Sequence, residues 1–269
     1  MNIEVSLMQM EKLINFVKIV DLNLYDKVFI NMTSVLNNMF YPTMINELAN
    51  EEALKQYRDT LKTQFKVNIM NSYKKDKKYF FYYSSQPSSN RKYHPEWDKD
   101  INAIKFSEPF ISIYREFINA VNTLGKQMKN IHVIDMKNIE SAYFPTYYSL
   151  HHKVDSRCLI ISRDMIDFIA IGEGFSLFDG ICVFKDLNKY AGTKKFPLIP
   201  NYLFKYYCYL KGVKKHSYDG IKGIGEAKAV KHIINNISNL DNDITFKKDL
   251  MTIFDIKRNI SENNIKIYF

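Results

Sequence analysis

The chain has little of what disulfide-rich, zinc-binding and membrane-spanning proteins depend on. Its 269 residues include three cysteines, which are widely spaced, form no CxxC pair and stand in apolar surroundings: Cys158, Cys182 and Cys208. This pattern indicates buried thiols in a reducing compartment and argues against a structural zinc site. No apolar run reaches the length of about 20 residues that a membrane-spanning helix needs.

The N-terminal stretch also lacks the features of an export signal. Residues 1–17 are acidic and amphipathic, whereas a signal peptide begins with positive charge followed by a continuous apolar segment. We therefore expect a cytoplasmic protein with no membrane partner.

The chain is rich in apolar residues and in positive charge. With 46% hydrophobic and 25% charged residues, it can bury a core as one large domain, with or without a small appendage. The formal net charge is +9, and lysines recur in short clusters such as KKDKK and KGVKK. A surplus of this sign favours a polyanionic partner, although a solvated helix end is the alternative for any one cluster.

Hydrophobic spacing predicts strands that alternate with helices. Strands are expected at residues 27–30, 79–83, around 132–134, 158–162 and 180–184. Helices are expected at residues 1–17, 54–69, 106–128 and 140–150. Such alternation implies an α/β fold with a mostly parallel sheet covered on both faces, whose ligands gather at the carboxyl ends of the strands.

Two segments depart from this alternation. Residues from about 84 to 104 are too polar for a core and are expected to form an exposed loop or arch. After Pro197 and Pro200 the chain is expected to be helical, with helices at 202–211 and 226–238 around a glycine-containing turn. The second helix is expected to bury one stripe of apolar residues, namely Ala227, Val230, Ile233, Ile234 and Ile237.

That turn holds Gly223, Ile224 and Gly225. Glycines at a helix start let the backbone approach a ligand, and the exposed amides and helix dipole favour an anion. Ile224 is expected to anchor the turn in the core. Four lysines surround the turn with positive charge, namely Lys214, Lys215, Lys222 and Lys228. The pattern predicts a phosphate-backbone site that does not read sequence, with an ordinary glycine helix cap as the alternative.

Together with Gly212 and Gly220, this segment resembles the helix-three-turn-helix of the 5'-nuclease, or flap endonuclease, family. The similarity is closest to the ribonuclease H of large-phage replication systems, and it extends over most of the chain. It implies a PIN-like nuclease domain over residues 1–200, with the arch at about 84–104. It also implies a small all-helical region over 201–269, made of the helix-three-turn-helix and a C-terminal helix.

Enzymes of this family hydrolyse phosphodiesters with two magnesium ions, which a dense cluster of carboxylates must hold. The resemblance implies that most of these carboxylates are substituted here, at Asn31, Ser84, Tyr143, Val213 and His216. Asp21 is a rival alignment for the first position. Glu140, Asp164 and Asp167 remain, of which Asp164 and Asp167 are the candidate magnesium ligands. Ordinary strand-end and helix-cap acids are the alternative for these residues.

The basic arch of the family also has a counterpart, with the sequence RKYHPEWDK. The resemblance implies that Arg91, Lys92 and Lys99 contact phosphates. Trp97 or Tyr93 would stack on an unpaired base. An exposed polar loop anchored by Trp97 is the alternative.

The sequence therefore predicts a structure-specific DNA-binding protein that resembles 5'-3' exonucleases and flap endonucleases but is catalytically impaired or inactive. One alternative is an active magnesium-dependent nuclease with a reduced metal site. Another is a scaffold that binds replication or transcription proteins in a viral complex. The Lys-, Asn-, Ile- and Tyr-rich composition and the phage-like resemblance favour a viral source, which would place the protein in the host cytoplasm.

Overall fold

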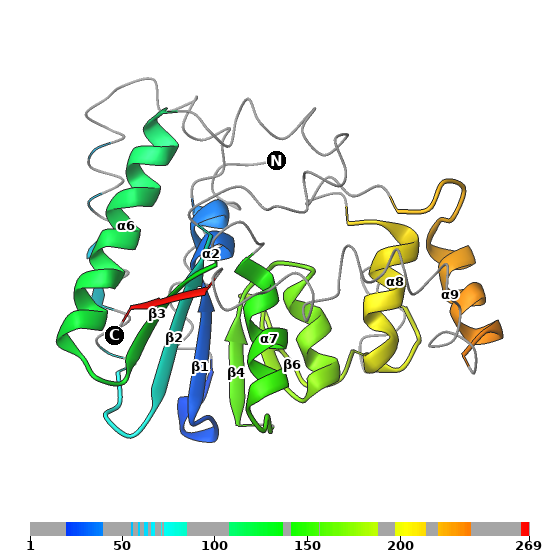
Figure 1. Cartoon of the computed structure of the whole chain (residues 1–269), viewed down its shortest axis with the longest axis horizontal. Helices are drawn as coiled ribbons and strands as arrows, with labels where there is room; N and C mark the ends of the chain where they lie inside the picture. The colour runs from blue at the N-terminus through cyan, green and yellow to red at the C-terminus, as the bar shows by residue number, and fades with distance from the viewer. Residues whose placement is uncertain are drawn as a thin grey trace.

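The computed structural model describes residues 20–39, 73–84, 108–136, 141–155, 157–187, 197–213, 220–237 and 265–268, with isolated helical positions between 55 and 71. The described residues form one seven-stranded sheet in the order β6-β5-β4-β1-β2-β3-β7 (Figure 1). The strands are β1 Lys27–Asn31, β2 Lys78–Tyr83, β3 Ile131–Met136, β4 Cys158–Ile161, β5 Ser176–Phe178, β6 Val183–Phe184 and β7 Ile265–Tyr268. Strands β1 to β5 pair in parallel, and β6 and β7 are antiparallel edge strands.

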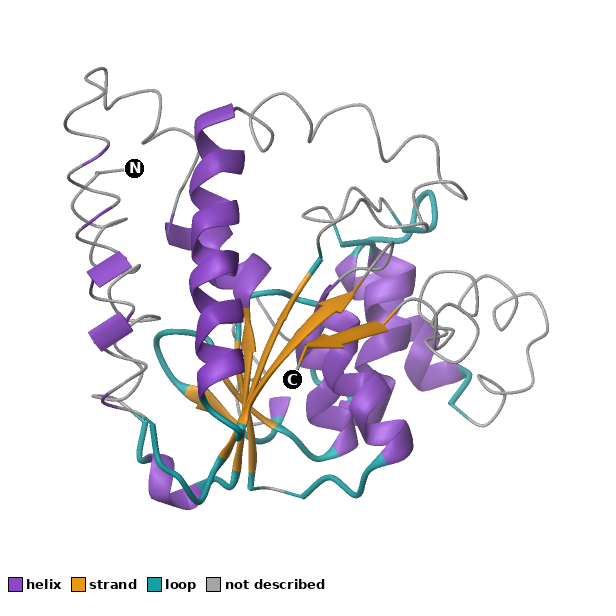
Figure 2. Ribbon diagram, turned by 60° about the vertical axis from the view of Figure 1, so that its left-hand side comes forward, coloured by secondary structure: helices purple, strands orange, loops and turns teal. Residues whose placement is uncertain are grey.

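The central strands are apolar on both faces because helices cover both faces (Figure 2). On one face, Phe29 packs against Phe80 and against Phe144 of α7, which spans Phe144–His151. On the other face, Val28 and Ile30 share a core cluster with residues of α2 (Met32–Met39) and α6 (Glu108–Gln127). The mostly parallel α/β architecture predicted from the sequence is therefore confirmed.

The predicted elements differ from the observed ones mainly where they are short. The three-residue strand β5 was not predicted, because Ser176–Phe178 is too brief to show an alternation. The strand expected at 180–184 is reduced to Val183–Phe184, since Gly180 adopts a left-handed φ of 93° in the turn that precedes it. Helix α7 begins at Phe144, after the 3-10 turn Ser141–Tyr143, with a proline in its first turn.

The expectation that the region after residue 200 is entirely helical was wrong at its end. Ile265–Tyr268 forms β7, which pairs antiparallel with β3. The physical reason is that β3 presents an edge of backbone donors and acceptors, and the sequence IKIY has the alternation of a strand. The expected helix at 1–17 and the arch at about 84–104 lie outside the described residues, apart from Ser84.

The helices of the second region are α8 (Phe204–Lys211) and α9 (Glu226–Asn235). The buried stripe of α9 differs from the predicted one. Of the predicted residues, Ile233 is buried and Val230 packs against the core, and Ala229 joins them. Ala227 is exposed, and Ile234 and Ile237 are 56% and 47% exposed. The physical reason is that α9 contacts its neighbours along a narrow i, i+4 row, so a wide apolar face is not covered. Within the described residues, no helix is both long and apolar enough to cross a bilayer.

We predict that Phe29→Ala destabilises the protein by about 3–5 kcal/mol, because it leaves a cavity among stacked rings in the centre of the sheet. The Phe29 ring is fully buried and lies 4.6 Å from the Phe80 ring and 5.1 Å from the Phe175 ring, centroid to centroid. Urea denaturation measures the change. Phe29→Leu is the matched control and should cost less than half as much; equal losses would contradict this account of the core.

Candidate functional site at the carboxyl ends of the strands

The candidate site lies where the strand order reverses. After β1 the chain adds β2 and β3 on one side of β1, and it then returns to add β4 and β5 on the other. In open α/β sheets, ligands bind at the carboxyl ends of the strands at such a switch point. Here these ends bring together Asn31 of β1, Tyr82 of β2, and Asp164 and Asp167 from the loop after β4.

Asn31 is buried and its side chain has a defined orientation. Its Oδ1 accepts hydrogen bonds from the backbone amide of Ser34 at 2.9 Å and from the hydroxyl of Ser141 at 3.2 Å. A backbone amide can only donate, so the oxygen must face Ser34 and the amide nitrogen must face the other way. That nitrogen donates to Oδ2 of Asp167 at 2.6 Å. Asn31 therefore presents an N–H to the site and turns its oxygen away.

Asp167 is fully buried, and each of its carboxyl oxygens accepts a hydrogen bond. Oδ2 is held by Asn31, and Oδ1 accepts from the hydroxyl of Tyr82 at 2.9 Å. Burial and the nearby charge of Asp164 raise the pKa of Asp167 to about 7, against the lowering effect of its hydrogen bonds. The carboxyl group is thus partly protonated near neutral pH.

Asp164 shapes the loop between β4 and Asp167. Its Oδ1 accepts from the backbone amide of Ile166 at 3.0 Å, and its own backbone amide donates to Oγ of Ser162 at 3.0 Å. These are turn-capping contacts, which satisfy backbone donors that the strand has left behind. The geometry supports the interpretation of Asp164 as a turn-capping acid.

The other described positions of the family's metal set hold neutral side chains. The hydroxyl of Ser84 donates to the backbone carbonyl of Met136 at 3.1 Å, which ties β2 to β3. Tyr143 and Val213 are buried in the same core cluster. Asp21, the rival for the first position, caps the 3-10 turn Leu22–Leu24 before β1 begins, and so it lies at the opposite end of the strand.

These residues do not fit a pair of magnesium ions. Magnesium requires charged oxygen ligands with room for octahedral coordination. Here both carboxyl oxygens of the buried Asp167 accept hydrogen bonds, one from an N–H and one from an O–H. Within the part of the chain that is described, no three His, Cys, Asp or Glu side chains are grouped so as to hold a metal.

Sequence reasoning missed the neutral partners in this site. Tyr82 is the clearest case, because Asn31 and Tyr82 are register partners on adjacent strands. Asn31 ends β1 and Tyr82 is the next-to-last residue of β2, but the pairing register is not visible in sequence. Arg163 lies just after β4, and its Nε donates to the backbone carbonyl of Asp179, just after β5, at 2.9 Å. Its own amide donates to Oγ of Ser34, which ties β4 to α2.

Several predicted site residues fall outside the described residues. They are Glu140, Arg91, Lys92, Lys99, Lys214, Lys215 and His216. Their predicted roles remain predictions.

The glycine turn joins α8 to α9 through a backbone contact that excludes side chains. Helix α8 ends at Gly212, whose φ is 87°, and Gly220 returns against it with a φ of 74°. A β-carbon on Gly220 would lie 2.4 Å from the Gly212 nitrogen and 2.6 Å from the Leu210 carbonyl oxygen. The amide of Ile221 donates to that carbonyl at 3.0 Å. Gly220 is therefore required for packing.

Gly223 and Gly225 make no such packing contact. Both are exposed, and a β-carbon on either would meet no atom within 4 Å. Ile224 is half-buried and packs against the core, as predicted. Lys222 is exposed at the tip of the turn, and exposed Lys228 donates to the carbonyl of Gly223 at 3.1 Å. The turn thus has an open backbone surface flanked by two cations.

We predict that Asp167→Asn flattens the pH dependence of the protein's stability. The folded-state pKa of Asp167 is about 7, above the value for an unfolded aspartate, so the folded state binds the extra proton between about pH 4 and 7. Wild-type stability should fall as pH rises through this window, and the variant should lack this fall. Chemical denaturation from pH 4 to 8 measures it. Asp155→Asn, an exposed acid before β4, is the control and should behave as the wild type.

We also predict that alanine substitutions at three glycines differ in their cost to stability, depending on whether the methyl group meets other atoms or only strains the backbone. Gly220→Ala should cost at least about 2 kcal/mol, because its methyl group meets backbone atoms in a left-handed residue. Gly223→Ala should cost about 1–2 kcal/mol, because only its left-handed φ of 83° is strained. Gly225→Ala has a φ of −90° and should cost less than about 1 kcal/mol. Thermal denaturation ranks the three, and equal costs would contradict the backbone contact.

No protein-family model and no curated protein matches the sequence. Among solved structures, the chain is similar to the D15 protein of bacteriophage T5 co-crystallised with metal ions, at 12% identity and a TM-score of 0.49, covering 84% of this chain and 88% of that chain. It is also similar to a T5 D15 flap endonuclease complex with DNA and metal ions and to a T5 5'-exonuclease with bound zinc. Each of these two is 13% identical with a TM-score of 0.49, and the match covers 83% of each chain.

Proposed function

We propose that this protein is a structure-specific DNA-binding protein that resembles 5'-nucleases and does not cleave what it holds. The turn from Lys222 to Lys228 would contact the phosphate backbone of duplex or branched DNA. The observation that carries the proposal is the contrast between two glycines. Gly220 is enclosed by backbone, whereas Gly225 has open space where its side chain would be.

The chemistry of the turn supports phosphate binding. Core packing accounts for Gly220, but nothing in the described fold needs the absence of a β-carbon at Gly225, which is exposed and has a negative φ. A backbone without a side chain can approach an anion closely, and the first amides of α9 point out of the helix start. Lys222 and Lys228 add positive charge beside it. Gly225 is also the N-cap of α9, a position that favours glycine, so the proposal depends on the open backbone and the two lysines taken together.

The candidate site supports the absence of cleavage. In a nuclease of this kind, Asp167 would have to give an accessible, charged oxygen to a metal ion. In this protein, Asn31 and Tyr82 donate hydrogen bonds to its two oxygens, and its pKa is raised. A side chain with these neighbours contributes to stability and is poorly suited to bind a cation.

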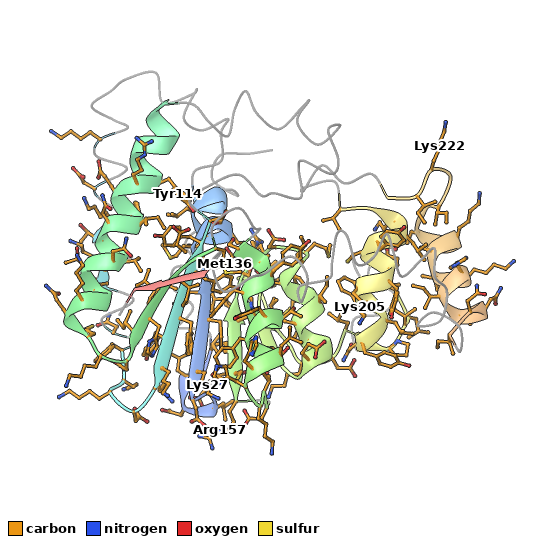
Figure 3. The ribbon with its side chains drawn as sticks, viewed as in Figure 1. Lys27, Tyr114, Met136, Arg157, Lys205 and Lys222 are labelled. Carbon is orange, nitrogen blue, oxygen red and sulfur yellow. The ribbon has the colours of Figure 1, made fainter. Side chains whose placement is uncertain are left out.

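The position of the turn supports binding of DNA on the same side of the molecule as the candidate site. In Figure 3, Lys222 extends from the turn on the side of the molecule toward which Tyr114 and Met136 lie, near the carboxyl ends of the strands. Lys27 and Arg157 lie at the other end. DNA bound at the turn would therefore extend along the side that holds the candidate site.

We predict that Gly225→Ala weakens binding to duplex and flap DNA by about tenfold, which is the loss of one good phosphate contact. Lys222→Gln should reduce the slope of log Kd against log salt by about 0.9, because one fewer counterion is released. Fluorescence anisotropy at several salt concentrations measures both. Lys126→Gln, an exposed lysine at the end of α6, is the control and should leave affinity and slope unchanged.

Two results would overturn the proposal. One is DNA affinity that is absent or insensitive to salt. The other is cleavage of labelled flap DNA in the presence of Mg²⁺ or Mn²⁺ that disappears in Asp164→Ala. The second result would establish the active-nuclease alternative, because a turn-capping acid has no reason to control product formation.

A further inference from the structure

A second basic surface lies at the amino ends of the strands, at the opposite edge of the sheet from the candidate site. Lys27 begins β1 and Lys78 begins β2, and the two are register partners. Phe29 and Phe80, which pack beneath α7, each follow one of these lysines by two residues. Because side chains two residues apart on a strand point to the same face, both lysines lie on the α7 face of the sheet. Like charges opposite each other on adjacent strands are unfavourable. This arrangement carries a cost that the fold itself does not require.

Histidines extend this surface on both sides. His132, the second residue of β3, stacks on the Phe80 ring with a centroid distance of 5.0 Å, which places it on the same face. Helix α7 ends over these residues, with His151 in its last turn and His152 as its C-terminal cap. The row therefore contains two lysines and three histidines contributed by three strands and one helix.

The Tyr148 ring of α7 contacts several members of this cluster. Nζ of Lys27 lies 5.8 Å from the centroid of its ring, and the His152 ring stacks on it at 4.2 Å. The Tyr148 ring also contacts Phe29 and Phe80, at 5.0 and 5.3 Å. Because these contacts fix the Tyr148 ring, Lys27 and His152 are held close to each other on it.

The acids near this surface, Asp26 and Asp155, accept hydrogen bonds from Arg157. Asp26 accepts a hydrogen bond from the guanidinium of Arg157, and Asp155 accepts one from the backbone amide of the same arginine. The ion pairs found among the described residues include neither Lys27 nor Lys78. The positive charge of the two lysines is thus available to an external anion.

Electrostatics agree with this geometry. Burial and Lys78 lower the pKa of His132, and burial together with His151, Lys27 and Lys78 lowers the pKa of His152. Lys27, Asp26 and Asp155 also act on the Cys158 thiol at the start of β4, which places these charges at the same edge of the sheet. A bound anion would reverse the effect of the lysines and draw protons onto the histidines.

We infer that Lys27, Lys78, His132, His151 and His152 form a phosphate-binding surface that takes a nucleic acid strand on the edge of the sheet away from the candidate site. The row crosses three adjacent strands, which lie about 4.8 Å apart, and so it spans roughly 10 Å. One phosphate cannot touch both ends of such a row, but successive phosphates of one strand can. The outer face of the exposed His152 ring adds a flat surface of the kind on which bases stack.

This inference is tested with a short oligothymidylate and histidine NMR. Adding the oligonucleotide should raise the pKa values of His132 and His152 by about half a unit or more. Affinity should increase as the pH falls from 8 to 5.5, because protonated histidines bind phosphate. Lys78→Gln should weaken this binding by about threefold or more and reduce the histidine shifts. Lys231→Gln, an exposed lysine on α9, is the control and should leave both unchanged.

The outcomes distinguish this surface from the glycine turn. Gly225→Ala should leave the histidine shifts intact even if it abolishes duplex binding, so either proposal can fail without the other. Histidine pKa values that do not respond to the oligonucleotide would overturn the inference. Equal shifts with inorganic pyrophosphate at the same phosphate concentration would also overturn it, because they would show a site for small anions.

Discussion

The hydrogen bond from Asn31 to Asp167 determines what the carboxyl edge of the sheet can do. Its direction is fixed on the other side of the amide, where Ser34 and Ser141 donate to the oxygen. The nitrogen must then face Asp167, which is fully buried. With Tyr82 donating to the second oxygen, the contact joins β1, β2 and the loop after β4 at the switch point of the sheet. The switch point of the sheet thus holds a hydrogen-bonded link between three segments.

That link also explains why the remaining acids do not amount to a metal site. A carboxylate binds magnesium well when it is charged and accessible, and burial removes both properties unless a cation compensates. Asp164 adds a like charge, which favours proton uptake by Asp167 over ionisation. The glycine turn depends on none of these residues, since Gly220 packs against Gly212 and the end of α8. The surface of the turn is therefore independent of the acids at the candidate site.

The sequence predicted the main elements of the fold because their signals are local. The run KVFI and the helical spacing from Phe106 onward are long enough to show their periods. It could not predict β5 or β7, because three or four residues form a strand only when a neighbouring edge is available to pair. In the candidate site, it identified Asn31 and Asp167 by their place in a pattern. It could not identify their direct contact or Tyr82, because register and side-chain orientation are set by packing between distant segments.

The two edges of the sheet follow from the same parallel pairing. Because β1, β2, β3 and β4 run in one direction, every strand begins at one edge and ends at the other. Residues at strand starts, such as Lys27, Lys78 and His132, are thereby gathered at one edge, and residues at strand ends, such as Asn31 and Tyr82, at the other. The end of α7 lies at the first of these edges, where its carbonyl groups favour nearby cations. A sheet of this kind separates the hydrogen-bonded edge that holds Asn31 and Asp167 from the edge that holds Lys27 and Lys78.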